Sequence, residues 1–274
     1  MQKDLHVAFV GTGTMGGALA RGLSVSQNCN PRTIALFDTN RKTAEDVQWK
    51  IGELSKVFST GNEACAHANV VVICVKPNLV LPVLSELSES LAHEPLVISI
   101  AAGITVAKLV SAYGKDTAPV VRAMPNTPCL IGEGATAFSR ATSVTDEQAN
   151  LVKSIFSAVG SAVEVEEKLM DAVTGLSGSG PAYVYLFIES LIDAGVNAGL
   201  PRVTARALAV QTVLGSALLM SDSTQHPAQL KDDVTTPGGT TIAALTALER
   251  TGFRASVLAA VTAARDRSKE LSQI

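Results

Sequence analysis

The sequence predicts an α/β fold in two parts: a doubly wound sheet over residues 1–165, followed by an all-helical domain over residues 166–274. Through about the first 160 residues, short β-rich runs alternate with helical stretches, whereas no convincing strand run follows Asp171. Strands separated by helices of this length imply right-handed crossovers and a parallel sheet with helices on both faces. A chain of 274 residues is also long enough for two domains of ordinary size.

Six runs of the N-terminal part have the composition of strands. In chain order they are LHVAFVG, TIALFD, VVVICV, LVISI, PVVRAM and ATAFS. VVVICV is apolar without alternation, which is typical of a central strand that is covered on both sides. Helical patterns lie between several of these runs, for example over residues 17–24 and 79–91.

The C-terminal part reads as four helices. Residues 181–199 form a long helix that begins at a proline, and a second helix follows Pro201. A third begins after Gly239, and a last one covers residues 254–271. Because Ala, Leu and Val lie on several faces of these helices, each must bury more than one side. With about 100 residues available here, we expect a second subunit to supply part of the cover, so that this domain dimerises; a compact monomeric bundle is the alternative.

Composition excludes several classes of protein. A net charge of −3 gives no basic footprint for nucleic acid or for an anionic membrane. The N-terminus leads almost directly into a strand without a secretory leader, and no run of about 18 apolar residues predicts a membrane span. The four cysteines form no CxxC pair and lie far from the four histidines in sequence, so we expect neither a disulfide framework nor a metal site. Buried, reduced thiols in a cytoplasmic protein are the expectation.

A glycine-rich loop follows the first strand and opens a helix. In VGTGTMGGALARGL, Gly11, Gly13 and Gly16 have the GxGxxG spacing. The first glycine permits the tight turn, the second lets a pyrophosphate approach the backbone, and the third lets helix and strand pack closely. The helix N-terminus then offers unpaired N–H groups to the anion. In this βαβ context the loop predicts a dinucleotide site of Rossmann type, formed by Gly11, Thr12, Gly13, Thr14, Met15 and Gly16; a merely structural turn is the alternative.

The end of the second strand carries conflicting signals about which dinucleotide binds. Asp38 lies where a carboxylate would accept a hydrogen bond from a ribose 2′-hydroxyl and favour NAD(H). Asn40, Arg41 and Lys42 follow at once and have the donors that hold a 2′-phosphate, although Arg41 and Lys42 are equally typical of a solvated helix start. We expect NADP(H), with NAD(H) as the alternative.

Two further strand ends are candidate cofactor contacts, because open α/β sheets bind ligands at the carboxyl edge of their strands. In VVICVKPN, Pro77 is expected to stop the fourth strand and Lys76 to hang over the crevice, unless it is an ordinary edge lysine. In ISIAAGIT, Ala101 and Ala102 are small enough to let a flat nicotinamide lie against the backbone.

These motifs, taken in order, resemble a known family. GTGTMGGALARGL, VKP, SIAAGIT, RAMPNTP, TGLSGSGPAYVYLFIESLIDAGVNAGLPR and HPAQLKDDVTTPGGTTIAAL cover nearly the whole chain and resemble the pyrroline-5-carboxylate reductases. The last two motifs are far more specific than the glycine loop. The resemblance implies a Rossmann domain, a helical dimerisation domain, and NAD(P)H-dependent reduction of the cyclic imine 1-pyrroline-5-carboxylate to proline. It also implies that substrate binds between the domains, in a homodimer or a higher homo-oligomer of dimers.

The resemblance gives the stretch VTTPGGTTIAAL a function, since in the family this loop holds the substrate carboxylate. A helix that begins after Gly239 leaves several N–H groups unpaired, with about half a positive charge between them. Glycines let these groups turn inward, and threonines add hydroxyl donors. A purely structural Pro-Gly turn followed by a threonine N-cap is the alternative, but it gives a role to only one of the four threonines. The expected substrate-binding residues are Val234, Thr235, Thr236, Gly238, Gly239, Thr240 and Thr241.

Carried over by matching position, Thr241 points its hydroxyl at the ring nitrogen of the imine and is the expected catalytic residue, while Asn126 lies near the nicotinamide. Gly178, Ser179 and Gly180 open the long helix beside the cofactor or serve helix packing alone. Two positions depart from the family. Thr224 and Gln225 precede His226 where the family often has a glutamate, and Gly61 stands where it often has an asparagine.

Two other classes of protein are alternatives for this chain. A β-hydroxyacid dehydrogenase, by resemblance, carries a catalytic lysine on the helix after a glycine-rich start, yet no lysine lies between Lys168 and Lys231. A dimeric redox sensor that binds NAD(P) is compatible with the fold, but it has no need of a carboxylate site.

Overall fold

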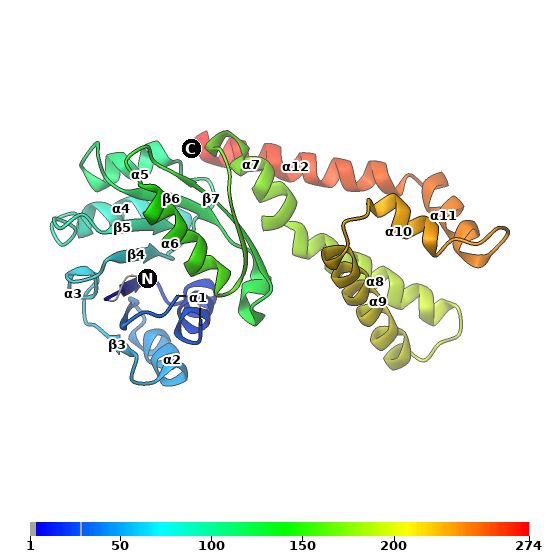
Figure 1. Cartoon of the computed structure of the whole chain (residues 1–274), viewed down its shortest axis with the longest axis horizontal. Coiled ribbons are helices and arrows are strands. Elements are labelled where there is room, and N and C mark those ends of the chain that lie inside the picture. The colour runs from blue at the N-terminus through cyan, green and yellow to red at the C-terminus, as the bar shows by residue number, and fades with distance from the viewer. Residues whose placement is uncertain (1–3, 28, 274) are drawn as a thin grey trace. The chain divides into compact units, whose positions relative to one another are not determined.

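A computed structural model describes residues 4–27 and 29–273. The chain forms two compact units (Figure 1). The first comprises Met1–Ser179 and Ala263–Ile274, and the second comprises Gly180–Thr262. The first unit contains the sheet and the second is helical, as the sequence predicts.

An eight-stranded sheet organises the first unit, with the order β3-β2-β1-β4-β5-β6-β7-β8 in the described part of the chain. All six predicted strands are confirmed. The strands are β1 (His6–Val10), β2 (Thr33–Phe37), β3 (Ser55–Val57), β4 (Val70–Ile73), β5 (Leu96–Ser99), β6 (Val120–Met124), β7 (Gly134–Arg140) and β8 (Gly160–Glu164). β3 and β8 escape the sequence analysis because β3 has three residues and β8 is half-exposed along its length.

The expectation of a wholly parallel sheet is wrong at one place: β7 runs antiparallel to β6, with Arg122 opposite Ser139. The link between the two strands holds only the short turn η1 (Thr127–Ile131), and a parallel crossover needs about a dozen residues or more. The remaining pairings are parallel.

Helices cover the sheet, and its central strands are buried. β4 and β5 are buried at every position, as the unbroken apolar run predicts. Figure 1 shows the helices of this unit on both sides of the strands. They are α1 (Thr14–Ser24), α2 (Arg41–Ile51), α3 (Gly61–Cys65), α4 (Pro77–Leu87), α5 (Val106–Tyr113) and α6 (Asp146–Ser157), followed by the turn η2 (Glu167–Leu169) and α7 (Met170–Val173).

The second unit begins where a π-helical segment, η3 (Thr174–Gly178), passes into α8 (Gly180–Asn197). The predicted helices are present as α8, α9 (Arg202–Asp222), α11 (Thr240–Arg250) and α12 (Phe253–Gln273). A further helix, α10 (Pro227–Asp233), was not predicted, because its seven residues are too few and too mixed in polarity to show an apolar period. The last turns of α12 belong to the first unit.

The helices of the second unit expose large apolar side chains, as their several apolar faces predict. Ala205 and Ala209 are the buried residues of α9, whereas Val203 is 83% exposed and Leu219 is 60% exposed. By length and composition alone, α9 is also long and apolar enough to cross a membrane, with a mean hydropathy of 1.5. The sequence analysis expected no apolar run long enough for a membrane span, and for α9 that expectation is wrong. One such helix is weak evidence for a span, because a helix that packs against another chain has the same composition.

Candidate active site

The glycine loop folds as its spacing requires. Gly11 has a φ of +93°, and its N–H donates to the carbonyl oxygen of Phe37 at 2.8 Å. A Cβ at this position would lie 2.9 Å from the backbone carbon of Cys74. At Gly16 a Cβ would collide with the carbonyl oxygen of Gly11 and lie 2.9 Å from the Cβ of Cys74. Both glycines are thus required by the packing of loop against strand.

Gly13 differs from its two neighbours in the motif. It is exposed, and beyond its chain neighbours no described atom lies within 4 Å of where its Cβ would stand. It is also the N-cap of α1, and none of the described side chains caps that helix. The open space and the uncapped N–H groups of Thr14 and Met15 together form a place for an anion.

Asp38 organises this loop from within the protein. Its Oδ2 accepts hydrogen bonds from the backbone N–H of Thr12 at 2.8 Å and from the Thr12 hydroxyl at 3.3 Å. Its Oδ1 accepts from the N–H of Asn40 at 2.9 Å. Arg41 is exposed and pairs with Glu45 one turn along α2, at 2.7 Å. The Asp38 carboxylate is thus already bonded within the protein, and the Arg41 guanidinium, which was expected to hold a 2′-phosphate, is paired with Glu45. The sequence analysis foresaw neither pairing.

Two more predicted contacts lie at the carboxyl edge of the sheet. β4 ends at Ile73, so Pro77 does not stop the strand as expected; it begins α4, where its missing N–H costs nothing. Lys76 is the exposed N-cap of that helix. After β5, Ala101 is buried and Ala102 is half-buried, and what these residues bind stays a prediction.

Asn126 is a buried clamp between segments. Its Nδ2 donates to the carbonyl oxygen of Ser177 at 3.1 Å, and its Oδ1 accepts from the N–H of Ala135 at 2.8 Å. The side chain thus ties the start of β7 to the π-helical segment. Its predicted place beside the nicotinamide is untested, and its amide already has partners on both sides.

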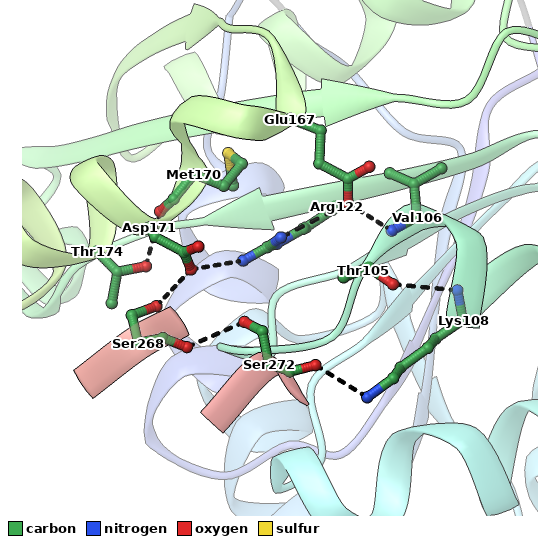
Figure 2. A network of polar contacts seen from close by, with 10 residues as sticks. All are labelled: Thr105, Val106, Lys108, Arg122, Glu167, Met170, Asp171, Thr174, Ser268 and Ser272. Carbon is green, nitrogen blue, oxygen red and sulfur yellow. Dashed lines mark hydrogen bonds and ion pairs between the residues drawn. The ribbon is translucent and has the colours of Figure 1, made fainter. Parts of the chain in front are cut away.

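A network of charged side chains surrounds Arg122 of β6, and the arginine itself is buried (Figure 2). The Arg122 side chain is 5% exposed, and its guanidinium lies 3.5 Å from Glu167 and 3.7 Å from Asp171. Asp171 accepts a 2.7 Å hydrogen bond from Ser268 of α12, and Glu167 accepts one of the same length from the N–H of Val106. The sequence analysis missed this network. An arginine within the apolar run PVVRAM was the signal, since a charge in a covered strand requires partners.

In the second unit, the predicted carboxylate loop lies between α10 and α11. Gly238 has a φ of +67°, and the N–H of Gly239 donates to the carbonyl oxygen of Thr236 at 3.0 Å. The Thr235 hydroxyl donates to the carbonyl oxygen of Lys231 at 2.7 Å. A Cβ at Gly239 would collide with the Thr236 hydroxyl. The loop is thus a tight turn in which Gly238 supplies the positive φ and Gly239 leaves room for the Thr236 side chain.

The helix after this turn begins without a side-chain cap. Gly239 is the N-cap of α11, and none of the described hydroxyls accepts a capping hydrogen bond there. This removes the alternative of a threonine cap. Thr241 is half-buried, while Thr240 and Val234 are exposed. Each threonine of the first turn therefore stands beside N–H groups that remain open to an anion.

The thiols offer no reactive group. Cys29, Cys65 and Cys129 are buried, Cys74 is partly buried, and all four are free. Burial raises the pKa of the Cys65 thiol to about 12, and it also raises the pKa of Cys29, Cys74 and Cys129. Among the described residues, no group of three or more His, Cys, Asp and Glu is arranged to hold a metal ion.

Comparison with known proteins places the chain. Residues 167–271 match the family model of the pyrroline-5-carboxylate reductase dimerisation domain. Residues 6–103 match a model described as NADP oxidoreductase, coenzyme F420-dependent. A pyrroline-5-carboxylate reductase of Arabidopsis thaliana is 45% identical over 99% of this chain and 97% of that relative.

The chain belongs to the pyrroline-5-carboxylate reductase family. Its fold matches solved structures of the family. The reductase of Coxiella burnetii has a TM-score of 0.91 at 36% identity, covering 97% of this chain and 98% of that one. A Plasmodium falciparum pyrroline carboxylate reductase with NADP bound has a TM-score of 0.86 at 36% identity, covering 99% and 100%. The predicted family, with its Rossmann-type first part and dimerisation segment, is confirmed.

Proposed function

We propose that this chain reduces 1-pyrroline-5-carboxylate to L-proline, the last step of proline biosynthesis, with NADP(H) as the hydride donor. Full-length relatives that carry this activity in their name support it. The observation that carries the proposal is the pair of uncapped helix N-termini, one after Gly13 and one after Gly239. Each is fitted to an anion: a pyrophosphate at the first, a small carboxylate at the second.

The residues around the first helix N-terminus fit a dinucleotide. Gly13 leaves room for a pyrophosphate against the backbone, and Thr14 and Met15 present N–H groups to it. NADP(H) is the proposed cofactor, supported by the NADP-bound relative from Plasmodium falciparum and by the NADP oxidoreductase match. Arg41 would hold the 2′-phosphate. NAD(H) is the alternative donor that Asp38 favours.

The cofactor site is proposed to continue along the sheet edge through Asn40, Lys76, Pro77, Ala101, Ala102 and Asn126. Small residues at Ala101 and Ala102 would let the nicotinamide lie against the loop after β5. Lys76 would meet ribose hydroxyls or the substrate carboxylate.

The second helix N-terminus fits the substrate. Val234 to Gly239 would wrap the carboxylate, and the open N–H groups at the start of α11 would bind it without an arginine. Holding the carboxylate fixes the ring of the imine, and with it the carbon that accepts hydride. NADPH supplies the hydride when bound.

The chain's own residues then hold the substrate and favour its reactive form. Reduction of the imine takes up a hydride and a proton, and the protonated iminium accepts hydride far better than the neutral imine. If the imine takes its proton from water, the chain needs to supply a hydrogen-bond partner to the ring nitrogen rather than a strong acid. Thr241 has a hydroxyl at the first turn of α11 and is half-buried. We assign it that contact.

A homodimer, or a homo-oligomer built of dimers, is proposed as the assembly. The match to a dimerisation domain supports it, as do the exposed apolar residues of α9. A groove of about 540 Å³ along α8 and α9, lined by Tyr185, Ile188 and Val210 among others, adds apolar surface for a second copy. The free thiols support a cytoplasmic location.

An assay of NADPH consumption with 1-pyrroline-5-carboxylate tests the proposal and separates it from its rivals. A reductase oxidises NADPH only when the imine is present and forms proline in equal amount. A β-hydroxyacid dehydrogenase would reduce NADP⁺ with a hydroxy acid instead. A redox sensor would bind NADPH without turnover, and either of those results would reject the proposal.

A further inference from the structure

We propose that Glu167 is a positioning residue for the cofactor. It acts through the loop between β5 and α5, residues 100–105, which we name the β5–α5 loop. The inference rests on the proposed function, because Ala101 and Ala102 of this loop are the residues expected to face the nicotinamide. Glu167 lies in the turn η2, far along the chain from the loop.

The β5–α5 loop is held at both ends. At its start, the N–H of Ile100 donates to the carbonyl oxygen of Ile73 at 3.2 Å, which continues the pairing of β5 with β4. At its end, the carboxylate of Glu167 accepts a hydrogen bond of 2.7 Å from the N–H of Val106, the first residue of α5. The loop between these anchors contains Gly103, whose φ of +77° permits a turn that other residues rarely adopt.

The Glu167 contact is of a strong kind. A carboxylate that accepts from the first N–H of a helix gains both a charge-assisted hydrogen bond and the favourable end of the helix dipole. Thr105 satisfies a different group, since its hydroxyl accepts from the N–H of Lys108 at 3.2 Å. Among the described side chains, Glu167 is thus the one that accepts a hydrogen bond from the first N–H of α5.

Arg122 holds Glu167 in place and divides the network into two arms (Figure 2). One carboxylate, Glu167, lies 3.5 Å from the guanidinium and bonds Val106, directly after the β5–α5 loop. The other, Asp171, lies 3.7 Å away and reaches Ser268 of α12. Among the described residues, each carboxylate is one of two partners of the same buried arginine, but only Glu167 bonds the N–H group that ends the β5–α5 loop. The Asp171 arm reaches α5 less directly, through Ser268, Ser272 and the Lys108 side chain. Asp171 is therefore a control that shares the arginine but not the contact at the end of the loop.

The first test compares the two arms. Removing either carboxylate takes one partner from Arg122, so Glu167→Ala and Asp171→Ala should both lower the melting temperature, and Asp171→Ala should lower it at least as much because Asp171 is the less exposed of the two. By fluorescence titration, we expect Glu167→Ala to raise the Kd for NADPH about tenfold, the effect of lowering the fraction of protein with a correctly held loop to about one tenth. Asp171→Ala should leave the Kd within about twofold. Glu167→Gln, whose amide oxygen can accept from Val106, should recover most of the affinity.

A second test removes the same hydrogen bond from its other side. Val106→Pro eliminates the N–H at a helix position where proline is well tolerated, and Thr105 already has the extended backbone that precedes proline. It leaves Arg122 fully paired. We expect Val106→Pro to raise the Kd for NADPH as much as Glu167→Ala does, and the double variant to raise it no further. The KM for NADPH should rise with it, while kcat and the KM for the imine stay within about twofold.

The proposal is overturned if Glu167→Ala or Val106→Pro binds NADPH as tightly as the unaltered protein. Equal weakening by Asp171→Ala would overturn it as well, since loss of stability alone would then account for the effect. Failure of the proposed function is distinguishable, because in that case the unaltered protein would not reduce the imine with NADPH, whether or not it binds the cofactor.

Discussion

Replacing Gly13 by alanine should weaken cofactor binding while leaving the stability of the fold nearly unchanged. The backbone of Gly13 has a φ of −59°, which alanine adopts without strain, and no described atom beyond its chain neighbours lies within 4 Å of the added Cβ. Alanine stiffens the unfolded chain, which stabilises by about 0.4–1 kcal/mol, and it is a poorer N-cap than glycine by a similar amount. The free energy of unfolding should therefore change by less than about 1 kcal/mol.

Binding should change much more, because the new methyl group occupies the space assigned to the pyrophosphate. If it displaces one charge-assisted hydrogen bond to the phosphate, the cost is about 1.5–3 kcal/mol, or about 10- to 100-fold in Kd. The assays are a fluorescence titration with NADPH and urea denaturation of the same preparation. Gly16→Ala is the contrasting variant: its Cβ would collide with the Gly11 carbonyl, so it should lose about 1–3 kcal/mol of stability.

The result that refutes this reasoning is a Gly13→Ala protein with unchanged affinity for NADPH. The pyrophosphate would then pass elsewhere, and the open space at Gly13 would have no connection with the cofactor.

Four further predictions follow from the same structure. Thr241→Ala should lower kcat about tenfold or more while Thr241→Ser retains most of it, as steady-state kinetics can measure. Asp38→Ser should raise the preference for NADPH over NADH, because it removes a carboxylate that repels the 2′-phosphate, whereas Arg41→Ala should lower it. The paired change Leu214→Glu and Leu218→Glu, at exposed apolar positions of α9, should yield a monomer in light scattering after gel filtration. Stability should fall between about pH 10 and 12, because burial and the nearby Glu94 carboxylate raise the pKa of Tyr113 to about 12 from 10.0. Over this range the unfolded chain loses its phenolic proton before the folded chain does, which favours unfolding. In urea denaturation, Tyr113→Phe should show a shallower decline of stability with pH.

Periodicity and glycine spacing predict most of this fold. The six strand runs are recognisable because each is rich in apolar residues, and the glycine loop because steric demands fix its spacing. β3 and β8 lack that signal, since one is short and the other half-exposed. The direction of β7 follows from a link too short for a crossover, and link length is hard to read where strand ends are uncertain by a few residues.

The site is predicted less evenly. Local features such as the uncapped helix after Gly239 follow from the sequence, because a helix N-terminus is a property of its neighbours in the chain. The partners of Asp38 and Arg122 do not follow, because they depend on segments that are distant in sequence. Arg122 meets Glu167 and Asp171 only once β6 and the chain after β8 have folded together.

The division of the chain has a practical consequence. The helical unit, Gly180–Thr262, interrupts a unit whose second segment, Ala263–Ile274, follows it in the chain. A fragment that stops at Ser179 would therefore lack the strand-bearing unit's own end, and Asp171 would lose Ser268. Trimming a dozen residues from the C-terminus would likewise damage the nucleotide-binding half before the helices. To obtain that half alone, one would join Ser179 to Ala263 through an artificial linker rather than simply shorten the gene.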